Sequence, residues 1–170
     1  MASALYNLSE YDSNNIPDGS KFHIHLVVSE WNQDITFSLA EGARKTLVDQ
    51  GVNQKNIKLS RVPGSYELIY GAKKAQEQKP DAVIVIGSVI KGETKHFEFI
   101  CHSVAQGIKD LNVHNDVPVI FCVLTDDNLS QAKDRSGGKY GNKGVEAAVC
   151  LLYTSPSPRD LSTSRMPSSA

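Results

Sequence analysis

The chain has 170 residues and a formal net charge of −1, with 40% hydrophobic and 22% charged residues. This length fits one domain with a buried core, and the nearly neutral charge argues against binding to nucleic acid or to an anionic membrane surface. No apolar run reaches the roughly 20 residues of a membrane helix, residues 1–20 lack a secretory signal pattern, and three widely separated cysteines indicate a reduced, cytoplasmic setting.

Strands and helices alternate along the chain after a polar arm at residues 1–20. Apolar and β-branched runs predict four strands, at residues 22–28, 56–62, 81–90 and 117–124. Apolar residues at helical spacing predict helices that begin near Ile35, Leu68, Phe97, Leu129 and Asn142, with a Gly-rich turn at 136–138. The third helix has the longest apolar stripe, formed by Phe97, Ile100, Val104, Ala105, Ile108 and Leu111. This alternation predicts an α/β fold, in which helices cover both faces of a parallel sheet.

The loops that follow the strands are the candidate site, because ligands of parallel sheets bind beyond the carboxyl ends of the strands. The first loop carries Trp31, the only tryptophan, followed by Asn32. Trp31 is either a packed aromatic at the domain edge or a stacking platform for a flat ring, with Asn32 as a hydrogen-bonding group beside it. The second loop ends at Glu67 near a helix start, where a carboxylate commonly caps the helix and can alternatively hold a polyhydroxyl chain.

The third loop runs from Gly87 to His96 and combines a strand end, a glycine turn and a helix start. Free N–H groups at such a start form an anion site. The loop is close to the phosphate-binding pattern GxxxxGK followed by Ser or Thr, but Glu93 stands at the lysine position, which argues against a nucleotide triphosphatase. His96 lies in the first helical turn and is suited to proton transfer, although an exposed or capping histidine is the more common occupant of such a place.

After the fourth strand, Arg135 is either a solvated helix charge or a residue that clamps a phosphate through its guanidinium. No metal is expected, since the sequence contains no metal-ligand spacing. The remaining histidines are interpreted as structural: His23, His25, His102 and His114.

Four sequence blocks together carry a family resemblance. They are Glu30-Trp31-Asn32, residues 62–67 (Val-Pro-Gly-Ser-Tyr-Glu), residues 87–96, and residues 118–148, the last with Gln131-Ala132, Arg135 and Asn142 to Ala148. Any single block is weak, whereas four blocks in register are specific. In these blocks the chain resembles the lumazine synthase family from about Lys21 to Cys150.

The resemblance implies the condensation of 5-amino-6-ribitylaminouracil with 3,4-dihydroxy-2-butanone 4-phosphate to 6,7-dimethyl-8-ribityllumazine in riboflavin biosynthesis, without a flavin, nicotinamide or metal cofactor. It assigns proton transfer to His96. It assigns the pyrimidine and its ribityl chain to Trp31, Asn32, Ser65, Tyr66, Glu67, Ser88, Val89, Ile90 and Phe121. It assigns phosphate binding to Glu93, Thr94 and Arg135, with Lys143 as an accessory residue.

The fold implied by the resemblance is a three-layer sandwich, with a four-stranded parallel sheet in flavodoxin-like order, in a catalytic domain at residues 21–153. The resemblance also implies assembly into pentamers or sixty-subunit shells, association with riboflavin synthase, and an arm at residues 1–20 that extends onto a neighbour. Arg135 and Phe121 are then expected to reach the site that holds His96 of the adjacent subunit.

The last segment, residues 154–170, departs from the family. It is rich in Ser and Pro and has neither a helical nor a strand period. We predict a non-native, disordered tail, which resembles read-through of a cloning or sequencing adapter.

Two alternative functions compete with this interpretation. The first is a non-catalytic protein on the same scaffold that binds a ribityl or flavin-like ligand or forms a shell. Loss of His96 or Arg135 would favour it, and both residues are present. The second is a degenerate nucleotide-phosphate hydrolase, which Glu93 at the lysine position opposes.

Overall fold

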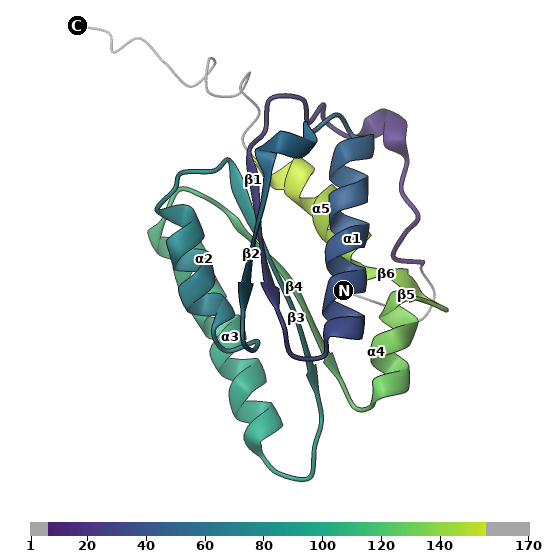
Figure 1. Cartoon of the computed structure of the whole chain (residues 1–170), viewed down its shortest axis with the longest axis vertical. Helices are drawn as coiled ribbons and strands as arrows, with labels where there is room; N and C mark the ends of the chain where they lie inside the picture. The colour runs from purple at the N-terminus through teal and green to yellow at the C-terminus, as the bar shows by residue number, and fades with distance from the viewer. Residues whose placement is uncertain (1–6, 156–170) are drawn as a thin grey trace, which may run out of the picture.

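A four-stranded parallel sheet forms the centre of the computed structural model, which describes residues 7–155 (Figure 1). The strands are β1 (Ile24–Ser29), β2 (Ile57–Val62), β3 (Ala82–Ile90) and β4 (Val119–Asp126), in the order β2-β1-β3-β4. Every residue of β1 is buried, as expected of an inner strand covered on both faces. The four predicted strands are therefore confirmed.

Helices cover both faces of the sheet and complete three layers (Figure 1). They are α1 (Gln33–Asp49), α2 (Leu68–Gln76), α3 (His96–His114), α4 (Leu129–Arg135) and α5 (Lys143–Thr154). One core lies between the sheet and the α1–α5 layer, and the other lies between the sheet and the α2–α3 layer. The predicted three-layer α/β fold in flavodoxin-like order is thus confirmed.

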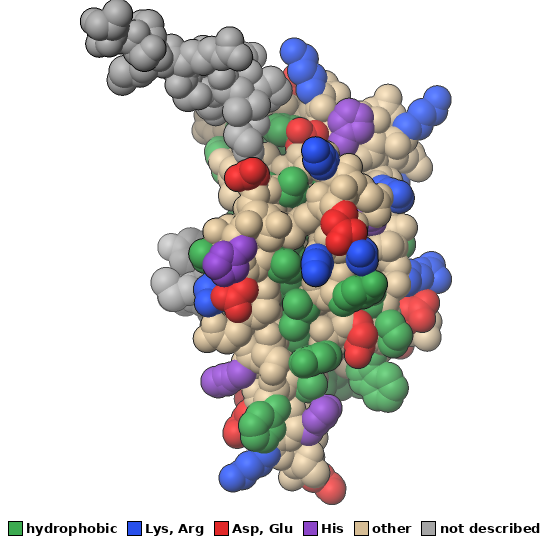
Figure 2. All heavy atoms as spheres, turned by 90° about the vertical axis from the view of Figure 1, so that its left-hand side faces the viewer, with side chains coloured by type: hydrophobic (Ala, Val, Ile, Leu, Met, Phe, Trp, Pro, Cys, Tyr) green, Lys and Arg blue, Asp and Glu red, His purple; other side chains and the backbone are tan. Residues whose placement is uncertain are grey.

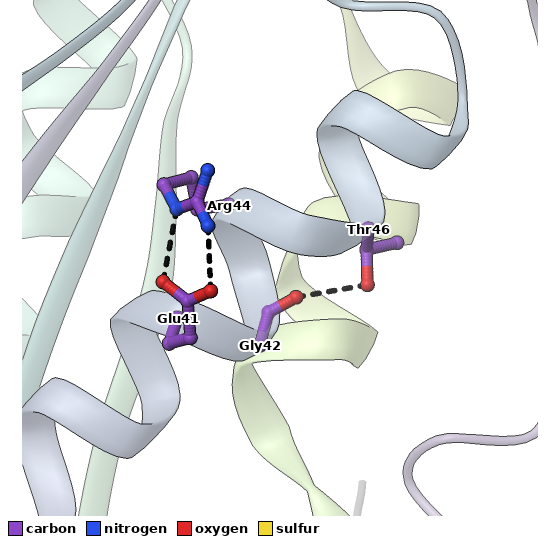
Figure 3. A network of polar contacts seen from close by, with 4 residues as sticks. All are labelled: Glu41, Gly42, Arg44 and Thr46. Atoms are coloured by element: carbon purple, nitrogen blue, oxygen red, sulfur yellow. Dashed lines mark hydrogen bonds and ion pairs between the residues drawn. The ribbon is translucent and has the colours of Figure 1, made fainter. Parts of the chain in front are cut away.

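The packing of α1 against α5 fixes where α5 begins. An added Cβ at Gly42 would lie 2.6 Å from the Asn142 side chain, so only glycine allows this approach. One helical turn away, the buried Thr46 hydroxyl donates to the Gly42 carbonyl at 2.9 Å, while Arg44 and Glu41 pair on the outer face with N–O distances of 2.6 and 2.9 Å (Figure 3). The N-cap of α5 is therefore held tightly against α1.

Two local predictions were wrong. The Gly-rich segment expected to be a simple turn forms a short antiparallel ribbon of β5 (Ser136–Gly138) and β6 (Gly141–Asn142), in which Gly137 and Gly141 have φ values of 120° and 82°. Such positive φ values are accessible mainly to glycine.

Ala105, expected in the buried stripe of α3, is exposed, because α3 lies at one side of the sheet and only Val104 and Ile108 are fully buried there. Hydrophobic side chains gather on this outer α2–α3 face (Figure 2).

The described part of the N-terminal segment lies against the ribbon of its own chain. Leu8 is buried, and its N–H donates to the Tyr140 carbonyl at 2.8 Å, while the Asn142 N–H donates to the Ser9 hydroxyl at 2.9 Å. The extension of this arm onto a neighbour stays a prediction.

Only the first two residues of the predicted C-terminal tail are described. Thr154 ends α5, and Ser155 is buried with its N–H donating to the Leu151 carbonyl at 2.8 Å. The rest of the segment lies outside the described residues. Within residues 7–155, no helix combines the length and apolar character needed to cross a membrane.

Candidate active site

A cavity of about 550 Å³ opens at the carboxyl ends of the strands. The loops after β1, β2 and β3 and the first turn of α3 form its wall. Among the lining residues are nine that the sequence singled out: Trp31, Ser65, Tyr66, Glu67, Ser88, Val89, Ile90, Thr94 and His96. Segments distant in the sequence thus converge on one cavity at the predicted edge of the sheet.

Four other lining residues were not predicted as site residues: Gly64, Gly92, Phe97 and Ile100. Phe97 and Ile100 were assigned to the buried stripe of α3, yet both are half-buried and face the cavity. A sequence signal existed for Ile100. It is four residues after His96, so the two side chains share one face of the helix.

Backbone contacts fix the loop that carries Trp31. The N–H groups of Glu30 and Trp31 donate to the carbonyls of Val62 and Pro63 at 2.8 and 3.0 Å, which ties this loop to the one after β2. The Trp31 side chain is 71% exposed, so its ring is available as a platform. Asn32 has φ 57°, a left-handed conformation that Asn tolerates, and its side-chain amide donates to the Ser88 carbonyl at 3.2 Å. Asn32 therefore braces the cavity wall rather than lining it.

Two buried hydroxyl groups line the cavity. Within residues 7–155, the Ser65 and Ser88 hydroxyl oxygens have no hydrogen-bond partner. A buried polar group without a partner is costly, so a ligand that bonds to it gains the missing interaction. A Cβ at Gly87 would lie 2.7 Å from the Ser65 hydroxyl, so glycine at this strand position makes room for it.

The start of α3 presents His96 and Thr94 to the cavity. The N–H of His96 faces the Thr94 hydroxyl oxygen at 3.4 Å. The first N–H groups of an α-helix have no partner inside the helix, and they favour an anion. At the root of this loop, the Lys91 N–H donates to the Asp126 carbonyl at 2.9 Å, which anchors the loop to β4. Glu93 is exposed and does not line the cavity.

The remaining predicted residues lie elsewhere in the chain. Phe121 lines a separate groove of about 400 Å³ along α3. Arg135 has its Nε 3.6 Å from Asp126 Oδ1 and its guanidinium 5.3 Å from the centre of the Tyr140 ring. Lys143 forms an ion pair with Glu146. A single chain therefore does not bring these three residues to the cavity.

The chemical groups of the site favour acid–base and binding chemistry. No cluster of three or more His, Cys, Asp or Glu side chains suited to a metal ion occurs in the described part of the chain. Burial raises the pKa of Cys122 to about 12, which makes this thiol a poor nucleophile. Burial also raises the pKa of Asp126, and the nearby Arg135 partly offsets that rise.

Comparison with known proteins shows one consistent similarity. The family model described as 6,7-dimethyl-8-ribityllumazine synthase matches residues 21–156. Proteins of that name from Flavobacterium johnsoniae and Parabacteroides distasonis are 60% and 55% identical to this chain over 153 residues, covering 89% of it and 80% and 96% of their own lengths. One from Christiangramia forsetii is 54% identical over 154 residues, which are 89% of this chain and 92% of the relative.

Proposed function

The chain belongs to the 6,7-dimethyl-8-ribityllumazine synthase family, and we propose that the cavity at the carboxyl ends of its strands performs the family's reaction. The chain is an enzyme of riboflavin biosynthesis. It condenses 5-amino-6-ribitylaminouracil with 3,4-dihydroxy-2-butanone 4-phosphate and releases 6,7-dimethyl-8-ribityllumazine, phosphate and water. The observation that carries the proposal is the convergence of Trp31, Glu67 and His96 on one cavity.

The pyrimidine substrate binds against the walls formed after β1, β2 and β3. Its flat ring stacks on Trp31, which offers an exposed aromatic face. The ring edges bond to the backbone of residues 88–90, and the ribityl hydroxyls bond to Glu67 and the Ser65 hydroxyl. Two buried hydroxyls without partners support this assignment, because a polyhydroxyl chain supplies what they lack.

The ketone substrate binds beside the start of α3, with its phosphate near Thr94 and the positive end of the helix dipole. The amine of the pyrimidine attacks the ketone carbonyl and water leaves, which forms an imine. Loss of the proton from the hydroxyl-bearing carbon then expels the phosphate and leaves an enol. The enol tautomerises to a new carbonyl, which the second amine attacks to close the ring with loss of a second water. His96 accepts and returns protons in these steps. Holding both substrates together accounts for much of the rate.

An adjacent subunit completes the site with Arg135 and Phe121. Both lie outside the cavity of their own chain. In a head-to-tail ring, one face of each subunit contacts a different face of its neighbour, so residues outside one cavity can reach the next one. We infer a pentamer, as the family resemblance implies, with Arg135 gripping the phosphate, Phe121 closing the pocket and Lys143 nearby. The free cysteines Cys101, Cys122 and Cys150 agree with a reduced, cytoplasmic setting.

The direct test mixes the protein with both substrates and follows lumazine absorbance and fluorescence together with phosphate release. We expect both signals to rise at equal rates, and neither to rise when one substrate is omitted. Tight binding of the pyrimidine without turnover would instead favour the non-catalytic alternative, which nothing in the site or the comparisons supports.

A further inference from the structure

Asp126 is a buried carboxylate for which the reaction above has no role. It is the last residue of β4 and is 4% exposed. Its Oδ1 lies 3.6 Å from Arg135 Nε, whereas its Oδ2 has no hydrogen-bond partner anywhere in residues 7–155. An incompletely satisfied buried carboxylate is unusual, so the fold or the function must account for it.

Stability does not explain Asp126. Burial raises the pKa of this carboxyl above its unfolded value. A group of this kind favours the folded state at low pH, and that contribution is lost as the pH rises through the folded pKa. Ionisation of Asp126 therefore costs the fold stability, and the contact with Arg135 offsets only part of that cost.

The geometry around Arg135 indicates what Asp126 does. Asp126 meets the Nε edge of the guanidinium, and Tyr140 lies against its face with 5.3 Å between the guanidinium carbon and the ring centre. Among residues 7–155, Arg135 approaches Asp126 through its Nε, and no side chain forms a hydrogen bond with the two terminal nitrogens. Those two nitrogens form one edge of the fork that grips a phosphate bidentately.

We propose that Asp126 is a positioning residue that orients the Arg135 guanidinium, so that its terminal nitrogens face the phosphate of the ketone substrate. The inference rests on the proposed role of Arg135 as the phosphate clamp. The backbone of Asp126 is itself fixed, because its carbonyl accepts from the Lys91 N–H at the root of the loop before α3.

A positioning role and a purely electrostatic effect of Asp126 predict opposite changes in phosphate affinity when its charge is removed, which makes the proposal testable. Removal of a negative charge near a phosphate site strengthens phosphate binding if charge alone matters. Loss of the group that orients Arg135 weakens it. The test variant is Asp126→Asn, which keeps the shape of the side chain. The matched control is Asp127→Asn, which removes one charge from a neighbouring side chain that is 69% exposed and 3.9 Å from Lys91.

We expect Asp126→Asn to raise the KM for the phosphorylated ketone by roughly 3- to 30-fold, which lies within the range of coupling between residues in contact. The KM for the pyrimidine should stay within about twofold of wild type, because the two substrates bind to different walls. Inorganic phosphate, used as a competitive inhibitor, should lose affinity in parallel with the ketone. Asp127→Asn should leave the ketone KM unchanged or slightly lower.

A double-mutant cycle with Arg135→Ala separates this inference from the function on which it rests. We expect Asp126→Asn to have no further effect on the ketone KM in the Arg135→Ala background. An unchanged ketone KM in Arg135→Ala itself would overturn the phosphate clamp. A large effect of Arg135→Ala with none of Asp126→Asn, or an additive double mutant, would leave the clamp intact and overturn the role of Asp126. Melting curves check folding, and Asp126→Ala replaces the asparagine variant if that one fails to fold.

Discussion

The loops after β1, β2 and β3 (the first region) differ from the segment that runs from β4 to α5 (the second region) in how they present their part of the site. The loops converge within one chain on a cavity that contains Trp31 and His96. The β4–α5 segment carries Arg135 and Phe121, neither of which lines that cavity. One chain therefore brings Trp31 and His96 together but leaves Arg135 and Phe121 outside the cavity, which is why we propose that the phosphate clamp comes from a neighbouring subunit.

We expect each of the two regions to bind mainly one substrate, and Arg135→Ala tests this most strongly. We expect the KM for the phosphorylated ketone to rise about 10²-fold, because charge-assisted hydrogen bonds to the phosphate are lost. The KM for the pyrimidine should change little. Steady-state kinetics with each substrate varied in turn measures both values.

Lys139→Ala is the matched control for Arg135→Ala, since the Lys139 ammonium also lies over the Tyr140 ring, at 5.1 Å. Lys139→Ala removes a nearby positive charge but leaves the Arg135 guanidinium in place. An equal loss of affinity for both substrates in Arg135→Ala would mean that this residue is structural.

His96→Ala tests the proton-transfer group of the first region. We expect kcat to fall by about 10²-fold or less, at the low end of the range for a general acid–base group, because the condensation has some intrinsic reactivity. Both substrates should still bind, as measured by titration. His102→Ala, on the exposed side of the same helix, serves as the control. Wild-type turnover in His96→Ala would end the assignment.

Trp31→Ala tests the stacking platform. We expect the KM for the pyrimidine to rise about 10-fold, since stacking of a base on an aromatic side chain contributes about 1–3 kcal/mol. The ketone KM should be nearly unchanged, the reverse of the result for Arg135→Ala. Trp31→Phe should retain most of the affinity, and if it binds as weakly as Trp31→Ala, stacking is not the function of this ring.

His25, in a part of the sheet remote from both regions, predicts a smaller effect, which is a dependence of folding stability on pH. Its side chain is buried next to the Ser60 hydroxyl at 3.1 Å, and its pKa is lowered, first by burial and then by Lys58. The unfolded chain therefore binds a proton at a higher pH than the folded chain, so stability is full above pH 6.5 and is lost as the pH falls below it.

We expect the melting temperature to drop by a few degrees between pH 7.5 and 5.5, and we expect His25→Gln to reduce that drop. Kinetic constants at pH 7.5 should not change in this variant. A pH dependence identical to that of the wild type would show that another group is responsible.

Much of the fold and of the first region could be predicted because the signals are local. The continuous apolar run of β3 and the helical spacing of Leu39 and Leu47 reflect burial directly. Trp31 and His96 follow strand ends, which meet at one edge of any parallel sheet.

The second region could not be predicted in the same way. The run from Val117 to Leu124 is apolar throughout, so its pattern does not show which side chains face which layer. The structure buries Cys122 and Leu124 in the α1–α5 core, whereas Phe121 is 38% exposed along α3. The contact of Arg135 with Tyr140 depends on the β5–β6 ribbon, which the sequence suggested only as a turn.

Co-expression of His96→Ala and Arg135→Ala chains tests most directly whether the two regions meet between subunits. Each parent variant has a defect in a different region. If the site lies between neighbours, random mixing at equal amounts leaves about a quarter of the interfaces with both residues intact, whatever the size of the ring. We therefore predict that the mixed oligomer recovers about a quarter of wild-type activity above the parental background. Mixed oligomers no more active than the average of the two parents would contradict the account, because each site would then lie within one chain.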